Sequence, residues 1–209
     1  MAQTLADLAR VVEGREIILL GNGPTVTDWD GTVGAGQAVA TVNAGLSLLA
    51  RMDRQAHLTW IQDERFLRRR SSTLLPHIAR AGALVVNERI IPQLPPNVGR
   101  RAIGVRMLGY VGFSRDPRIG VFHGYNAVHG ILQILAWARV RSVQLWGVPL
   151  LYWSTNTRFD QAKRGSDVDL HRASDQVSVT LRGIETVRQM GVEVTIHSDS
   201  ALSRAVLPA

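Results

Sequence analysis

The residues best suited to chemistry form the pentapeptide Gly21-Asn22-Gly23-Pro24-Thr25, which directly follows an apolar run over residues 17–20. A short apolar run that ends at a glycine is typical of a buried strand. Two glycines around an asparagine allow a tight turn with exposed backbone N–H groups, and Asn22 adds a side-chain donor. The pentapeptide has neither the third glycine of a dinucleotide-binding fingerprint nor the Gly-Lys-Ser/Thr of a P-loop. We therefore interpret it as a phosphate-binding turn, with a plain strand-to-helix turn as the alternative.

A second candidate is His171, which follows a long polar segment and precedes an expected helix. An imidazole at this place could take a proton from a substrate hydroxyl as a general base, and Asp167 and Asp169 are near it in sequence. The alternative is a surface histidine close to the start of a helix. The six histidines show no His-x-x-x-His spacing and no HExxH motif, and the two Asp-x-Asp pairs are interpreted as turn carboxylates. No metal site is expected.

Polar side chains also follow the other apolar runs, at the points where the expected strands end. In a parallel sheet, ligands bind beyond the carboxyl ends of the strands. Such side chains therefore predict a nucleotide site, although Asn and Asp are also common in ordinary turns. The residues at these positions are Asn22, Asn43, Gln62, Asp63 and Asn87.

Short apolar runs alternate with segments of helical period along the whole chain. This alternation predicts a single α/β domain over residues 1–209, with a mainly parallel, Rossmann-type sheet flanked by helices. The expected strands span residues 16–20, 39–42, 57–61, 83–86, 142–146 and 192–196, and the expected helices span residues 3–12, 45–52, 64–80, 125–138 and 172–190. One further short strand is expected near residues 103–107. Residues 154–170 are polar and aperiodic, which predicts a lid-like loop.

The composition excludes several classes of function. The chain has 209 residues, of which 45% are hydrophobic and 20% charged, so an ordinary packed core is expected. It has no cysteine, which excludes disulfides, thiolate catalysis and zinc held by cysteine. No secretory signal and no stretch of about 20 apolar residues is visible, so we expect a cytoplasmic protein.

The net charge of +7 comes almost entirely from arginine, because Lys163 is the only lysine. Arginine side chains suit phosphates and carboxylates. The basic clusters at residues 68–70 and 100–101 lack interleaved aromatic residues, so nucleic acid is not an expected partner. A peripheral contact with an anionic membrane and a homo-oligomer both remain open.

The ordered motifs resemble the bacterial sialyltransferases of glycosyltransferase family 42 over most of residues 16–207. That family opens with a strand and Gly-Asn-Gly-Pro-Ser, where this chain has Gly21-Asn22-Gly23-Pro24-Thr25. Its second strand ends in an asparagine, here Asn43, and a polar residue follows its third, here Gln62 or Asp63. Its later part runs through a helix, a strand, a glycine and a polar loop to a histidine, here His171.

The resemblance implies a GT-A-like α/β fold with a lid, and transfer of sialic acid from CMP-sialic acid to a hydroxyl of a glycan acceptor. It assigns Asn22 and Asn43 to the CMP part of the donor and makes His171 the general base. No cofactor besides the nucleotide-sugar donor is implied.

The resemblance also points to further substrate contacts. Asn126 lies where the family has Thr-Ser-Gly, and Thr157 lies where it has a loop tyrosine. Leu151 occupies the place of the other loop tyrosine, and Tyr152 is the residue after it. Asn126, Tyr152 and Thr157 are therefore candidate substrate-binding residues.

The sequence thus predicts a CMP-sugar-dependent glycosyltransferase with a histidine base. Two alternatives remain open. A non-catalytic protein that binds a nucleotide or a sugar-nucleotide is favoured by the residues at positions 151 and 157. A pterin diphosphokinase-like enzyme, using ATP and magnesium, would share the Gly-x-Gly-Pro-Ser type of turn.

Overall fold

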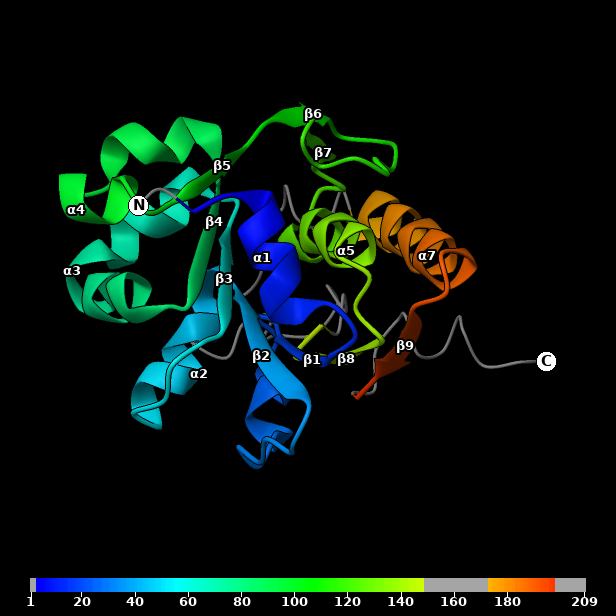
Figure 1. Ribbon diagram of the computed structural model, residues 1–209, viewed down its shortest axis with the longest axis horizontal. Helices are drawn as coiled ribbons and strands as arrows, with labels where there is room; N and C mark the ends of the chain where they lie inside the picture. Colours follow the sequence, from blue (N-terminus) through cyan, green and yellow to red (C-terminus); the bar gives the residue numbers. More distant parts are fainter. Residues whose placement is uncertain (1–2, 149–172, 198–209) are drawn as a thin grey trace.

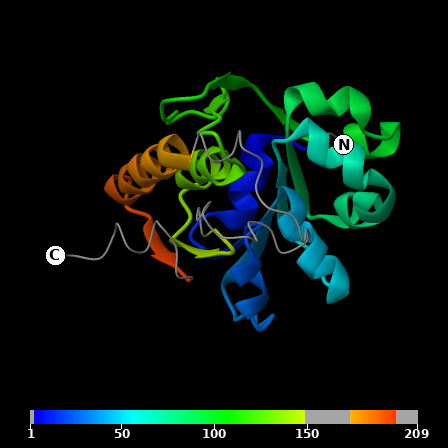
Figure 2. The same ribbon diagram turned by 180° about the vertical axis from the view of Figure 1, so that it is seen from behind.

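A seven-stranded sheet with the order β5-β4-β3-β2-β1-β8-β9 forms the centre of the protein (Figures 1 and 2). The computed structural model describes residues 3–148 and 173–197. All neighbouring strands of this sheet are parallel, and the expected α/β fold of Rossmann type is confirmed. The strands are β1 (Glu16–Leu20), β2 (Gln37–Val42), β3 (Leu58–Ile61), β4 (Ala83–Asn87), β5 (Ile103–Val105), β8 (Ser142–Trp146) and β9 (Glu193–Ile196).

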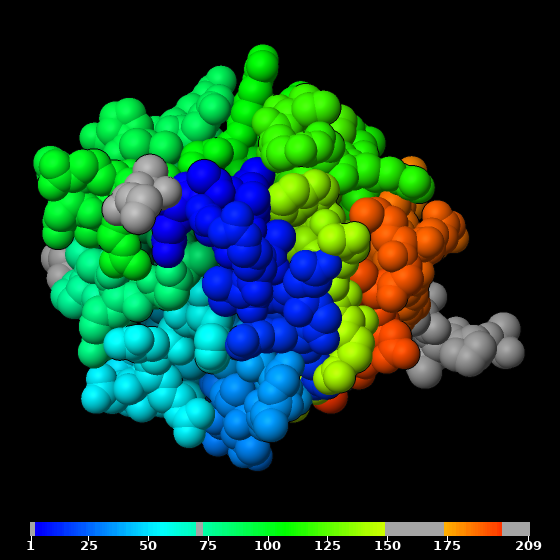
Figure 3. Space-filling view, in the orientation of Figure 1, coloured from blue at the N-terminus to red at the C-terminus, as the bar shows by residue number. Residues whose placement is uncertain are grey.

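Helices cover both faces of the sheet. One face packs against α1 (Leu5–Val12), α5 (Ala127–Trp137) and α7 (Ala173–Gln189). The other face packs against α2 (Leu46–Arg51), α3 (Glu64–Arg80), α4 (Pro96–Gly99) and the 3-10 helices η1 (Pro24–Asp28), η2 (Asn43–Gly45) and η3 (Glu88–Gln93). In the space-filling view, α1 (blue) lies between the green and the yellow-green parts of the chain (Figure 3). Within the described ranges, no helix is long and apolar enough to cross a bilayer.

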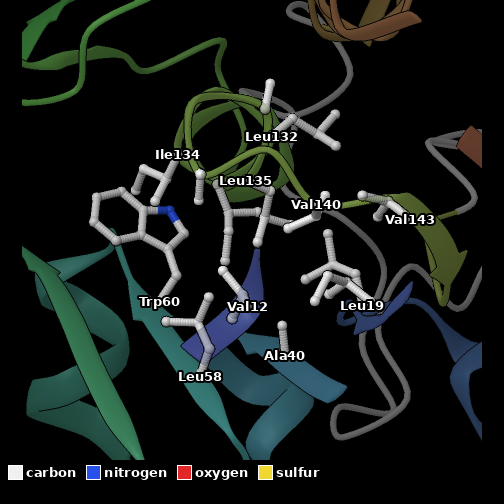
Figure 4. Packing of buried hydrophobic residues seen from close by; sticks show 14 of the residues in the cluster. Val12, Leu19, Ala40, Leu58, Trp60, Leu132, Ile134, Leu135, Val140 and Val143 are labelled. Carbon is white, nitrogen blue, oxygen red and sulfur yellow. The ribbon is translucent and has the colours of Figure 1, made fainter. Parts of the chain in front are cut away.

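The core is divided by the sheet, because side chains alternate between the two faces of each strand. In β1, Leu19 packs with α1, α5 and α7, whereas Leu20 packs with the helices on the opposite face. Figure 4 shows Trp60 of β3 among the side chains of α5, with Val12 of α1 nearby. The continuous apolar strands in the sequence therefore correspond to strands that are buried on both faces.

Two expectations need correction. The helix expected from residue 125 begins at Ala127, because Tyr125 has a left-handed φ of 59° and the Asn126 side chain caps the helix. The single strand expected near residues 103–107 is two elements: β5, and then β6 (Met107–Gly109). β6 pairs with β7 (Val121–Phe122) outside the main sheet. Strands of two or three residues are too short to produce a recognisable period in sequence.

The predicted lid over residues 154–170 lies outside the described residues.

Candidate functional site

The candidate site lies at the carboxyl edge of the sheet, where the direction of chain winding reverses. β1 is hydrogen-bonded to β2 on one side and to β8 on the other. The chain passes from β1 through β2, β3 and β4 to β5, and then returns to the other side of β1 as β8. The crevice at such a switch point is the usual ligand site of an open parallel sheet. The pentapeptide Gly21–Thr25 follows β1 at this point.

The turn after β1 is hydrogen-bonded to the end of β8, and these bonds decide which of its N–H groups remain available to a ligand. The N–H of Gly21 donates to the carbonyl of Trp146 (2.8 Å), and the N–H of Gly23 donates to the carbonyl of Gly147 (2.7 Å). A Cβ on Gly21 would lie 2.5 Å from the Gly147 carbonyl oxygen, so glycine is required there by close approach. The two glycine N–H groups expected to be exposed are thus used within the fold. Pro24 and Thr25 begin η1.

The side chain of Asn22 joins the turn to the end of β2. Its Oδ1 accepts the N–H of Gly45 at 3.2 Å, and a Cβ on Gly45 would lie only 2.2 Å from the carbonyl oxygen of Leu20. The two strand ends therefore meet with no room for a side chain between them. Within the described chain the Nδ2 group of Asn22 has no acceptor, so it is the donor that this turn leaves for a ligand.

Asn43 links the ends of β2 and β3. Its Oδ1 accepts the N–H of Gln62 (3.1 Å) and the N–H of Asp63 (3.4 Å), and its own backbone has a left-handed φ of 45°. Asn87, at the end of β4, donates from Nδ2 to the carbonyl of Gln62 at 3.5 Å. The predicted polar residues of four strands are therefore brought to one edge. Asp63 also caps α3 by accepting the N–H of Arg65.

Two polar atoms beneath this edge are buried without a hydrogen-bond partner among the described residues: Oε1 of Gln62 and the hydroxyl oxygen of Thr25. The Gln62 side chain is only 4% exposed, and its Nε2 donates to the carbonyl of His123 at 3.3 Å. An unsatisfied buried polar atom is costly, and a bound ligand or water is the usual explanation for one in a native protein. Both atoms belong to residues that the sequence predicts to bind substrate.

The segment before α5 contributes to the edge in a way that sequence reasoning missed. Tyr110 stacks on Tyr125, with ring centroids 5.1 Å apart, and lies against the ring of His123 at 5.2 Å. The side chain of Asn126, by contrast, is used for hydrogen bonds within the protein. Its Oδ1 accepts the N–H of His129, and its Nδ2 contacts the carbonyl of Gly124 and the hydroxyl of Thr180. No local signal marks the tyrosine pair, because 15 positions separate the two residues.

Buried His129 makes the stability of this region dependent on pH. The side chain is 1% exposed, and its Nε2 donates to the Gly112 carbonyl at 2.8 Å, which requires the neutral ring to carry its proton on Nε2. Burial lowers the pKa of His129 below its ordinary value of 6.5, and the nearby His123 and Arg182 lower this pKa further. The bond to Gly112 opposes this shift but does not reverse it.

We expect the free energy of unfolding to fall as the pH decreases from about 7 to about 5. Below pH 6.5 the unfolded chain takes up a proton at His129 before the folded protein does, so acid favours unfolding. Urea denaturation over this range should show a smaller pH slope for His129→Gln than for the wild type. Some slope should remain, because burial also lowers the pKa of His57 and His197. Equal slopes in the two proteins would contradict this account of His129.

Three of the predicted site residues, His171, Tyr152 and Thr157, lie outside the described residues. The described helix α7 begins at Ala173, two positions after His171. Asp30 is exposed, and its carboxylate accepts the N–H of Thr32 at 2.7 Å. Over residues 3–148 and 173–197, no group of three His, Asp or Glu side chains is placed to hold a metal ion.

Comparison with known proteins adds little to this description. No protein-family model and no curated protein matches the sequence. Among solved structures, the chain is similar to the sialyltransferase CstII from Campylobacter jejuni in complex with the substrate analogue CMP-3FNeuAc. The identity is 10%, the match covers 91% of this chain and 84% of that chain, and the TM-score is 0.42. This likeness is too remote to support a function.

Proposed function

We propose that this protein binds a CMP-sugar at the β1–β8 switch point and transfers the sugar to a hydroxyl group of a glycan acceptor. The observation that carries the proposal is the set of amide side chains at the carboxyl edge. Asn22 and Asn43 each have Oδ1 held by backbone N–H groups that lie just beyond the carboxyl end of the neighbouring strand. Their Nδ2 donors are thereby oriented by the fold, and such fixed donors suit the phosphate and ribose oxygens of a nucleotide.

The proposed reaction is a single displacement. His171 would take the proton from the acceptor hydroxyl as that oxygen attacks the anomeric carbon of the donor sugar. The bond from the anomeric carbon to the CMP phosphate oxygen breaks, CMP leaves, and the configuration is inverted. Because CMP is a good leaving group, we propose that the reaction needs no metal. Sialic acid is the proposed donor sugar, following the motif order of the sequence.

A thermal-shift screen with CMP, CDP, UDP, GDP, ATP and CMP-sialic acid, with and without magnesium, tests the ligand. Selective stabilisation by CMP and CMP-sialic acid is the expected result, because a ligand that binds only the folded state raises the melting temperature. Stabilisation by ATP and magnesium alone would favour the diphosphokinase-like alternative instead. Release of CMP from CMP-sialic acid in the presence of an acceptor then separates an enzyme from a binding protein.

A non-catalytic sugar-nucleotide-binding protein is the second candidate. It is favoured by Leu151 and Thr157, which stand where the resembled family has its two loop tyrosines. CMP binding without any release of CMP from CMP-sialic acid, over a panel of glycan acceptors, would support this candidate.

Asn22→Ala should weaken CMP binding by roughly 10- to 100-fold, because one hydrogen bond to a charged group contributes roughly 1.5–3 kcal/mol. Asn22→Asp is the sharper variant. It keeps an oxygen acceptor for the Gly45 N–H, but it removes the Nδ2 donor and places a negative charge beside the phosphate. Calorimetry should therefore show weak CMP binding for both variants. Asn97→Ala, a change of the same type on α4, serves as the control. Wild-type CMP affinity in folded Asn22→Asp would remove Asn22 from the site.

A further inference from the structure

The large apolar side chains exposed by the described chain are concentrated on the segment of residues 106–122, here called the ribbon. The ribbon consists of β6, β7 and the loop between them, and its strands pair only with each other. Figures 1 and 2 both show β6 and β7 at the upper edge of the molecule, next to α5. Of the five such side chains in the described ranges, only Val11 lies elsewhere. The other four are Leu108 (37% exposed), Tyr110 (52%), Val111 (57%) and Ile119 (66%).

The charged residues of the ribbon are mainly cationic. Arg106 and Arg115 are exposed, and neither guanidinium has a hydrogen bond or ion pair within the described chain. Asp116 is the one acidic residue of the ribbon. Its two carboxylate oxygens accept from Nε and Nη2 of Arg118, each at 2.8 Å. The ribbon therefore presents two unpaired arginines beside its apolar side chains, and its only carboxylate is already neutralised.

We propose that the ribbon docks on the surface of an anionic lipid bilayer. The apolar side chains enter the boundary between headgroups and acyl chains, while Arg106 and Arg115 bind lipid phosphates. Tyr110 suits the same boundary, because it combines an apolar ring with a polar hydroxyl. The association is peripheral and depends on both the apolar and the cationic parts of the ribbon.

A lipid surface fits the ribbon better than a protein partner does. A stable protein interface buries about 800 Å² on each partner. Four side chains, one on β6 and three on the loop that follows it, expose only about a few hundred Å², which is typical of a small functional patch. A bilayer boundary accepts a narrow apolar projection and adds a negative surface potential that attracts arginine. β7 leads through His123 into α5, so a docked ribbon would hold the carboxyl edge of the sheet close to the lipid.

Co-sedimentation of the full-length protein with lipid vesicles tests this proposal independently of the proposed function. The protein should bind vesicles in which about a third of the phosphatidylcholine is replaced by phosphatidylserine, and it should bind pure phosphatidylcholine much more weakly. Binding should weaken as the salt concentration rises from about 0.05 M to about 0.5 M, since salt screens the arginines. No binding to the anionic vesicles, or equal binding to both kinds, would overturn the proposal.

Paired variants locate the contact. Arg106→Gln with Arg115→Gln should weaken binding by about 25-fold, because each arginine contributes about fivefold. Val111→Ser with Ile119→Ser should weaken it by on the order of tenfold, and both changes are at exposed positions that leave the core intact.

Two matched controls should bind as wild type. They are Arg68→Gln with Arg69→Gln on α3, and Val11→Ser on α1. Equal losses in the controls would overturn the assignment to the ribbon. The proposal would also be overturned if the wild type failed to bind vesicles and instead self-associated in analytical ultracentrifugation, and if only the ribbon variants abolished that self-association.

Discussion

Replacing His171 by alanine is expected to lower the rate of sugar transfer by about 10²–10⁴-fold, which is the usual contribution of a general base. In the proposed complex, the donor binds through the turn after β1 and the amides of Asn22 and Asn43. Its affinity should therefore stay close to that of the wild type. The variant thus separates chemistry from binding: turnover falls while the CMP dissociation constant does not change. Transfer from CMP-sialic acid to an accepted glycan, measured beside CMP calorimetry, gives both quantities.

His77→Ala is the matched control for this experiment. His77 is in the last turn of α3, a helix that is capped by Asp63 on the carboxyl edge and runs to the opposite edge of the sheet. Its loss should leave turnover unchanged. If His171→Ala keeps most of the wild-type turnover, His171 is not the general base.

Replacing Trp60 by alanine is expected to lower the free energy of unfolding by about 3–5 kcal/mol, as for other buried tryptophans. The indole is fully buried between β3 and α5. A Cβ on Gly130 of α5 would lie 3.2 Å from Cζ2 of Trp60, so the helix backbone packs directly against the ring. The cavity left by alanine cannot be filled by a flexible neighbour at that contact. Urea denaturation measures the change.

Trp60→Phe is the control, and it should cost much less than Trp60→Ala. Phenylalanine keeps most of the apolar volume, and it removes an indole N–H that has no acceptor among the described residues. Equal destabilisation by the two variants would contradict the packing of α5 on β3. Loss of CMP binding in folded Trp60→Ala would further show that this packing holds Gln62, which directly follows β3, at the site.

The turn at Gly21–Thr25, which the sequence predicts to bind phosphate, illustrates what local sequence can and cannot predict. The position of Gly21–Thr25 at the end of a buried strand was predictable, because apolar runs and glycines are local signals. The hydrogen-bond partners of its N–H groups were not predictable. Gly21 and Gly23 donate to carbonyls more than 120 positions away, at the end of β8. The donor that the turn still offers is therefore the Asn22 side chain, and not the amides of Gly21 and Gly23.

Asn126 and the ribbon show the same difference between what local sequence predicts and what only the tertiary structure decides. A polar residue at the start of an amphipathic helix is compatible with both a substrate contact and an N-cap, and only the neighbouring His129 N–H and Thr180 hydroxyl identify the cap. The ribbon gave no periodic signal because its strands have two or three residues. Its exposed apolar side chains became apparent only when the surrounding helices were in place.

The sequence by itself determined the α/β class, the main strands, the amphipathic helices and the placement of polar residues at the strand ends. These properties depend on side-chain period and on glycine, which act over a few residues. Only the tertiary structure decided the strand order, and with it the meeting of β1 and β8 at the switch point. It also decided that Asn22, Asn43 and Asn87 each bond to the strand end beside them. Pairings of this kind join residues about 20 or more positions apart, and the packing of the whole sheet selects them.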